Sequence, residues 1–536
     1  MGALRRMRVI FPFVAILVCV LPARHGTSQE IPEELLTVAE KSGWRATEHH
    51  ADVVELMNRL DAASELAHVE TAGTTSEGRS IPILVIADPP VENPNETGGR
   101  LTVFAWGGIH SGEVCGKPAT LMLARELVTT PNHPLLKDLV VLLLPLLNAD
   151  GNERMSPDNR PGQDGPVEGM GIRANAMGLN INRDFTKLDA PETRAVLHVL
   201  NRWDPAVAID LHTTNGSRHR YVLTYDGHRH PASDDPLRAL TKDKLLPWVT
   251  AEVRKNTGYE MFFYGNFDRT RTKWLIDDAM PRYSTHYLGL RHHMGILSEA
   301  YSYATYQDRV IASREFVRHC FQFVAVHKDD VRRIRDEAKR RTVELGNQPV
   351  EGNLVALRRE SRLSDKPIEI LGYDNPSPRG EAGEPKTYSV SSNDLNVATL
   401  SVPRPYAYIV PARLENVLDR LRAHGIEIGS LPQEGPIDVE VYRVESVRRL
   451  FEQRVYEGHS PVAVDVTVRR EQKTLSAGTP IVRTGQPLGT LAAYLLEPQS
   501  EDGFCTWNFL DDDLAVGNDL PILRVPAVMD LETAVR

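Results

Sequence analysis

The chain has 536 residues, of which 41% are hydrophobic and 25% are charged. This composition excludes a disordered, collagen-like or coiled-coil protein, and the length predicts two or three domains. The formal net charge is −10 without any block of basic residues, which argues against a nucleic-acid partner.

The first thirty residues have the pattern of a secretory signal peptide. Arg5, Arg6 and Arg8 precede the apolar run 9–21, and polar residues follow. This run is too short to cross a bilayer core of about 30 Å as a helix. Retention as a membrane anchor is the alternative, because no clear cleavage site follows the run. We expect residues 1–28 to be a signal peptide of a secreted or periplasmic protein, with no transmembrane segment beyond it.

Residues 46–330 alternate helical and strand-like patterns. Helical spacing of apolar residues predicts helices at 53–60 and 117–128, and a proline followed by an acid opens a third at 191–203. Strands buried on both faces are predicted by short, nearly continuous apolar runs at 101–106, 139–147, 206–211 and 295–297. This region is therefore expected to be α/β, with a mixed, mostly parallel sheet flanked by helices.

The pattern changes after a charged, helix-like stretch at 328–345 and a hinge at 349–352. Valines alternate with other residues from 462 to 468, which indicates half-buried antiparallel strands. A helix is expected at 414–424, and a loop at 373–387, which is rich in Pro, Gly and Glu. We predict a catalytic domain over 29–348 and a mainly β accessory domain over 349–536.

Three cysteines follow the signal region: Cys115, Cys320 and Cys505. Their odd number and wide spacing fit neither a disulfide framework nor a zinc knuckle, so at most one bridge is expected.

Polar residues that a core does not need follow several of the predicted strands. His110 and Glu113 lie three apart in GGIHSGEVCG (107–116), although an H-x-x-E pair alone is weak evidence. His212 comes at the end of the strand in AIDLHTTNG (208–216), and two histidines with one carboxylate suit a catalytic zinc. Glu299, in GILSEAYSY (295–303), is an ionisable residue directly after an apolar strand, where burial is normally costly.

Together with an R-x8-NR pattern over 173–183, these pieces resemble the zinc carboxypeptidase superfamily of carboxypeptidase A-like metallopeptidases. The resemblance covers about residues 46–325, including TSEGRSIPILVI at 75–86. It implies one zinc ion per chain, held by His110, Glu113 and His212. It also implies that Glu299 exchanges protons during catalysis.

The resemblance further implies that Arg173 stabilises the oxyanion and that Asn182 and Arg183 bind the substrate's α-carboxylate. Structural roles are the alternatives: Arg173 as a surface loop residue, Asn182 as a turn former, and Arg183 as an ion-pair partner of Asp184. The family's mobile tyrosine is assigned to Tyr287, with Tyr283 as its rival.

Three features depart from the family pattern. Asp184 follows Arg183 where asparagine is more usual. This difference leaves the metal site intact but is expected to alter its rim. The C-terminal domain is longer than in some secreted members, and its stretch LLEPQSEDGFCTWNF (495–509) has no assigned role. Six histidines that match no motif are expected to be solvated or structural: His219, His228, His230, His286, His292 and His293.

The sequence thus predicts an exported zinc metallocarboxypeptidase that hydrolyses the C-terminal bonds of peptides or proteins. Three alternatives stay open: a related zinc amidase such as an N-acyl-amino-acid deacylase, a carboxypeptidase for cell-wall peptides, and a pseudo-peptidase that only binds peptides.

Overall fold

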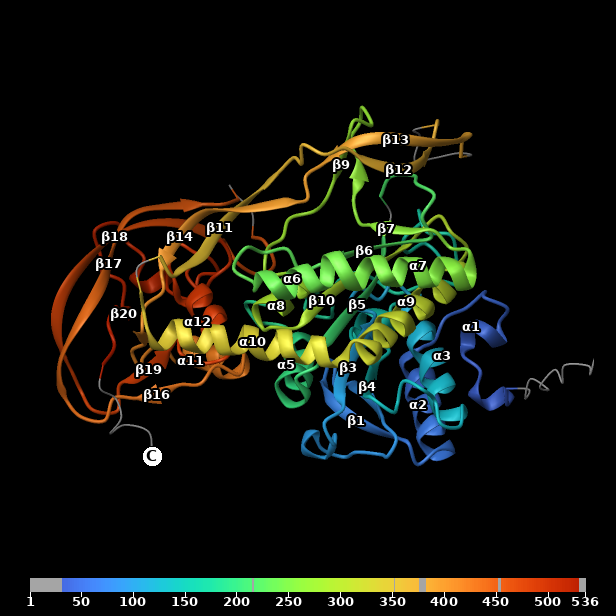
Figure 1. The fold of residues 1–536 in the computed structure, drawn as a ribbon, viewed down its shortest axis with the longest axis horizontal. Helices are drawn as coiled ribbons and strands as arrows, with labels where there is room; N and C mark the ends of the chain where they lie inside the picture. Colours follow the sequence, from blue (N-terminus) through green and yellow to red (C-terminus); the bar gives the residue numbers. More distant parts are fainter. Residues whose placement is uncertain (1–30, 215, 351, 376–381, 452–454, 530–536) are drawn as a thin grey trace, which may run out of the picture.

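The computed structural model describes residues 31–214, 216–350, 352–375, 382–451 and 455–529 (Figure 1). The predicted signal peptide lies outside these residues. Among them, every helix is too short or too polar to cross a bilayer.

A sheet of eight strands forms the centre of the first half of the chain, in the order β1-β2-β4-β3-β5-β10-β6-β7. The strands are β1 (Ala67–Thr74), β2 (Ser80–Ile86), β3 (Leu101–Gly107), β4 (Leu139–Leu144), β5 (Val207–Thr214), β6 (Leu223–Gly227), β7 (Met261–Phe263) and β10 (Met294–Tyr301). Neighbours β4, β3, β5 and β10 run parallel, whereas β1, β2 and β6 add antiparallel pairs. The predicted mixed sheet is confirmed.

Helices cover both faces of this sheet because its central strands are apolar on both sides. Every residue of β3, β4 and β5 is buried. Val103 and Ile209 pack with α2, α3, α7 and α9, whereas Phe104 and Ala208 face the opposite side and pack with α5 and α8. These helices are α2 (His50–Ala63), α3 (Gly116–Thr129), α5 (Pro191–Trp203), α7 (Leu246–Thr257), α8 (Ser284–Leu290) and α9 (Tyr306–Val326); α1 (Val38–Lys41), α4 (Ala149–Asn152) and α6 (Asp235–Ala239) are shorter.

Helix α10 (Lys328–Asn347) leads to the C-terminal region, which is mainly β as predicted. Its six-stranded sheet contains β15 (Ala407–Ile409), β16 (Gly429–Ser430), β17 (Gly435–Arg449), β18 (Val462–Leu475), β19 (Pro480–Arg483) and β20 (Leu523–Val525). Strands β11 (Leu354–Arg362) and β14 (Leu395–Pro403) form a second, two-stranded sheet. Two helices, α11 (Glu415–Ala423) and α12 (Gly489–Leu496), pack beside the strands.

The segment expected to be a loop at 373–387 is partly a hairpin. Strand β12 (Ile368–Tyr373) pairs with β13 (Pro385–Ser392), so strand structure begins at Pro385 within that segment. The hairpin continues into β9 (Lys273–Leu275) and β8 (Asn266–Phe267) of the first half of the chain. In Figure 1 it lies at the top, above β7 and apart from β17 and β18.

The two halves of the chain share buried apolar surface. One hydrophobic cluster joins Trp106 and Leu197 of the first half to Tyr408, Leu418 and Tyr494 of the second. Just before the expected hinge, a Cβ added to Gly346 in α10 would lie 2.2 Å from the carbonyl carbon of Thr484. The division at residue 348 stays a prediction, but the chain is closely packed around it.

Candidate active site

The polar residues singled out in the sequence gather at the carboxyl ends of β3, β5 and β10. His212 lies in β5 directly beside Glu299 in β10, and the loop after β3 carries His110 and Glu113. This loop folds tightly over β5. A Cβ on Gly116 would lie 2.9 Å from the Cβ of Leu211, which explains a glycine in the flank of the motif. The sheet therefore assembles the site at the strand ends where α/β proteins bind ligands.

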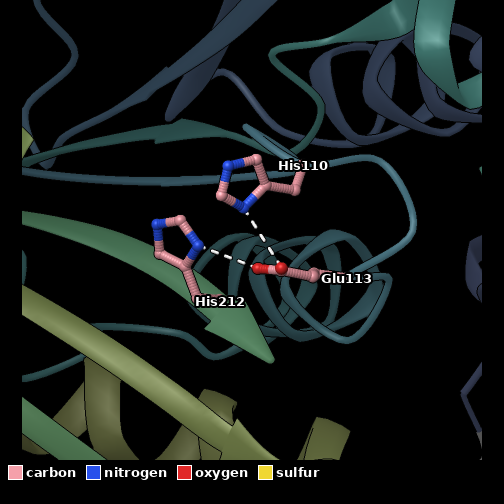
Figure 2. Close-up of side chains that lie close together, drawn as sticks. All are labelled: His110, Glu113 and His212. Carbon is pink, nitrogen blue, oxygen red and sulfur yellow. Dashed lines mark hydrogen bonds and ion pairs between the residues drawn. The ribbon is translucent and has the colours of Figure 1, made fainter. Parts of the chain in front are cut away.

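His110, Glu113 and His212 form the one group of three potential metal ligands found among the described residues. All three are buried, and their ligand atoms lie within 4.8 Å of one another. Nδ1 of His110 is 3.1 Å from Oε1 of Glu113, and Nδ1 of His212 is 2.8 Å from Oε2 (Figure 2). Two imidazole nitrogens and a carboxylate that converge in this way suit a single zinc ion.

Polar partners on the far side of each imidazole fix its orientation. Nε2 of His110 is 2.8 Å from Oδ1 of Asn180, and Nε2 of His212 is 2.9 Å from Oδ2 of Asp210. Because these oxygens accept the Nε2 protons, each Nδ1 lone pair is left for a metal. Sequence reasoning missed both partners. Asp210 could have been found, since it lies two residues before His212 on the same face of a strand.

The charges around this cluster favour the ionised form of Glu113, which is the form that can coordinate a metal. Burial alone would raise the pKa of Glu113, but His110 and Arg160 hold it well below its ordinary value. Nη1 of Arg160 is 3.1 Å from Oε1 of Glu113. Burial lowers the pKa of His110 to about 4, whereas Asp210 overcomes the burial of His212 and raises its pKa well above the ordinary value. Arg160 lies in the loop PDNRPGQDG (157–165), which carried no recognisable signal in the sequence.

Glu299 faces the same cavity, whose volume is about 210 Å³. Burial raises the pKa of Glu299 to about 8; His212 opposes this shift, and the carboxylates of Glu113 and Asp277 add to it. A bound divalent cation nearby would favour the ionised carboxylate. The group therefore lies where it can exchange protons close to neutral pH.

The cavity also brings together Arg173, predicted to stabilise the oxyanion, and the two residues predicted to bind the α-carboxylate. Nη1 of Arg173 is 3.3 Å from Nδ1 of His110. Asn182 accepts a hydrogen bond from the backbone N–H of Ser284, and the Arg183 guanidinium lies 4.2 Å from the ring centre of Tyr283. Arg173, Asn182, Arg183 and Tyr283 all line the cavity. Their catalytic and binding roles stay predictions.

Tyr287 does not belong to this group. Its side chain is fully buried in α8, and its hydroxyl lies 2.6 Å from Nδ1 of His424 and 3.2 Å from Arg291. A tyrosine held there by the C-terminal region does not reach a substrate. Tyr283, which lines the cavity at the start of α8, replaces it as the candidate.

Asp184 does not lie at the rim either. It is fully buried, and it binds Lys187 rather than Arg183. The six unassigned histidines are all buried, and one of them, His286, lines the cavity. All three cysteines after the signal region are buried and free.

The chain is similar to several known proteins. Residues 53–244 match a family model described as Zinc carboxypeptidase. In sequence, the chain is similar to Carboxypeptidase 2 of Trichophyton rubrum, with 24% identity over 491 residues that cover 88% of this chain and 85% of that protein. Carboxypeptidase 2 of Trichophyton tonsurans is 22% identical over 469 residues, covering 84% and 81%. Among solved structures, carboxypeptidase A from Helicoverpa armigera gives a TM-score of 0.40 at 15% identity, covering 53% of this chain and 74% of that chain.

Proposed function

We propose that this chain, whose residues 53–244 match the zinc carboxypeptidase family model, is an exported enzyme that removes residues from the carboxyl ends of peptides. The observation that carries this proposal is the convergence of separate chain segments on one cavity. These segments supply a metal-ligand cluster, a carboxylate of raised pKa and the arginines Arg173 and Arg183.

The donor atoms of His110, Glu113 and His212 fit zinc. They are buried, they combine nitrogen and oxygen, and Asn180 and Asp210 orient the two imidazoles. Zinc bound in such a site supplies Lewis acidity. With three protein ligands, a bound zinc ion would keep a position open for water or substrate, as catalytic zinc sites do.

The chain's own residues account for the remaining steps of peptide hydrolysis. The Glu299 carboxylate takes a proton from the attacking water, whose oxygen bonds to the carbonyl carbon of the scissile peptide. The C–N bond then breaks, and Glu299 returns the proton to the leaving amine. Arg173 stabilises the negative charge that develops on the carbonyl oxygen.

Asn182 and Arg183 make the enzyme specific for the end of a chain. A planar guanidinium binds a free carboxylate through two charge-assisted hydrogen bonds, which an internal peptide bond cannot accept. The Tyr283 ring against Arg183 limits the orientations of this guanidinium.

The test compares peptides that differ only in a free or an amidated carboxyl terminus. Amidation should lower kcat/KM about 10²-fold, because one charge-assisted contact contributes about 1.5–3 kcal/mol. Equal rates on both peptides would refute the proposal. Faster cleavage of N-acyl amino acids than of blocked dipeptides would instead identify a deacylase, and binding without any turnover would identify a pseudo-peptidase.

A further inference from the structure

One wall of the active-site cavity is a single segment, residues 272–283. It contributes Asp277, Asp278 and Tyr283 to the cavity lining. Apart from the short strand β9 it has no regular secondary structure before α8 begins. Its position must therefore be fixed by contacts with other parts of the chain.

The C-terminal region holds the first part of this segment. Strand β13 pairs in parallel with β9, so that Ser391 lies opposite Lys273. Asn393 then clamps Ile276: its Oδ1 accepts from the Ile276 N–H at 2.6 Å, and its Nδ2 donates to the Ile276 carbonyl at 3.2 Å. Ile276 directly precedes Asp277, the first of these three cavity residues.

Two further side chains of the C-terminal region hold the middle and the end. Nη2 of Arg359 lies 2.9 Å from Oδ1 of Asp278. Asp502 is fully buried and accepts from the backbone N–H of Arg282 at 2.6 Å, while its other oxygen is 2.9 Å from Nε of Arg282. Asp502 belongs to the stretch 495–509, which had no assigned role in the sequence.

These polar contacts matter because the segment is not packed on all sides. A second cavity of about 440 Å³ borders it, and Asp278 and Tyr283 line both cavities. The remaining lining of the second cavity includes Tyr456 and Arg448 of the C-terminal region. The start of the segment is packed, since Trp274 is fully buried, whereas its later residues lie between the two cavities and depend more on these polar anchors.

We propose that Asn393 and Asp502 are positioning residues for substrate binding, which act through the 272–283 segment and make the C-terminal region part of the active site. This inference rests on the proposed function for its kinetic consequences. The anchors touch neither the metal cluster nor Glu299, so we expect them to act mainly on how well a substrate fits.

The kinetic test uses the full-length zinc enzyme and peptides ending in lysine, leucine or glutamate. Asn393→Ala should raise KM about tenfold and reduce the differences in kcat/KM among these peptides, because it removes both hydrogen bonds that hold Ile276. Zinc content and kcat should stay within about threefold. Asn393→Asp, which keeps an acceptor for the Ile276 N–H, should restore part of the loss, and Asp502→Asn should resemble Asn393→Ala.

Asn416→Ala is the matched control, because Asn416 is an exposed residue of the same region that does not contact the segment. Unchanged KM and selectivity in both anchor variants would overturn the inference. A parallel loss of zinc and kcat would also overturn it, since the anchors would then support the whole fold.

Hydrogen exchange gives a readout that does not depend on activity. Amides of residues 274–283 should exchange at least about tenfold faster in Asn393→Ala than in the wild type, and those of β3 and β5 should not change. If the wild-type enzyme cleaves no free carboxyl terminus, the proposed function fails; if exchange in the variant is unaltered, the positioning role fails.

Discussion

Asp184 offers a quantitative test of how the loop that follows Asn182 and Arg183 is held in place. Oδ1 accepts from Lys187 Nζ at 2.8 Å and from the Asp189 N–H at 3.0 Å. Oδ2 accepts from the Ala190 N–H at 2.9 Å and from Thr193 Oγ1 at 2.7 Å. The carboxylate thus ties the loop after Arg183 to the start of α5 and neutralises a fully buried lysine.

Asp184→Asn, the residue more usual in the family, should destabilise this protein. The new NH₂ group must face two of the four donors, and an unsatisfied buried polar group costs about 1–3 kcal/mol. Lys187 also loses its nearer carboxylate and keeps only Asp189 at 3.6 Å, and breaking a buried ion pair on one side costs about 3–5 kcal/mol. Because these penalties overlap, we expect the free energy of unfolding to fall by about 3–5 kcal/mol.

Urea unfolding followed by tryptophan fluorescence measures this change. Asp419→Asn serves as the control, since Asp419 is exposed and should shift stability by less than about 0.5 kcal/mol. Adding Lys187→Met to Asp184→Asn should recover part of the loss. A decrease of less than about 1 kcal/mol in the free energy of unfolding of Asp184→Asn would refute the reasoning.

Other expectations concern the metal, the proton-transferring group and pH. Purified protein should hold about one zinc ion per chain, His212→Ala should lose most of it, and full occupancy in that variant would remove His212 from the ligand set. Glu299→Gln should keep zinc and peptide affinity but lower kcat at least about 10²-fold; surviving turnover would place the base elsewhere. Burial lowers the pKa of Lys117 from 10.5 to about 8 in the folded protein. Between these pH values the lysine therefore binds more protons in the unfolded chain than in the folded one. Over this range the wild type should gain about 3 kcal/mol of stability relative to Lys117→Met, and parallel pH profiles would contradict this.

Local patterns predicted the central elements well. The runs at 101–106 and 206–211 are continuous and apolar because these strands are buried on both faces, a condition that leaves a direct mark on sequence. The motif order also brought His110, Glu113 and His212 together correctly, since each follows or ends one of neighbouring strands.

No comparable sequence pattern identified the residues that contact the site from distant segments of the chain. Arg160 and Asn180 reach the metal cluster from irregular loops, and Asn393 is distant in sequence from the segment it holds. Tyr287 lies away from the cavity and Tyr283 lines it, a placement that sequence spacing near α8 could not give, because spacing does not tell which side of the helix meets the C-terminal region. Such placements depend on tertiary packing rather than on periodicity.

The bond between Arg282 and Asp502 joins residues 220 positions apart, which has a consequence for the chain during its synthesis. A ribosome adds about 5–20 residues each second, so about 10–45 s pass between the emergence of these two partners. The metal ligands and Glu299 are all translated before or soon after Arg282. The growing chain therefore carries the predicted metal ligands and Glu299 well before Asp502 can hold the 272–283 segment, and we expect full peptidase activity only once the C-terminal region has been made.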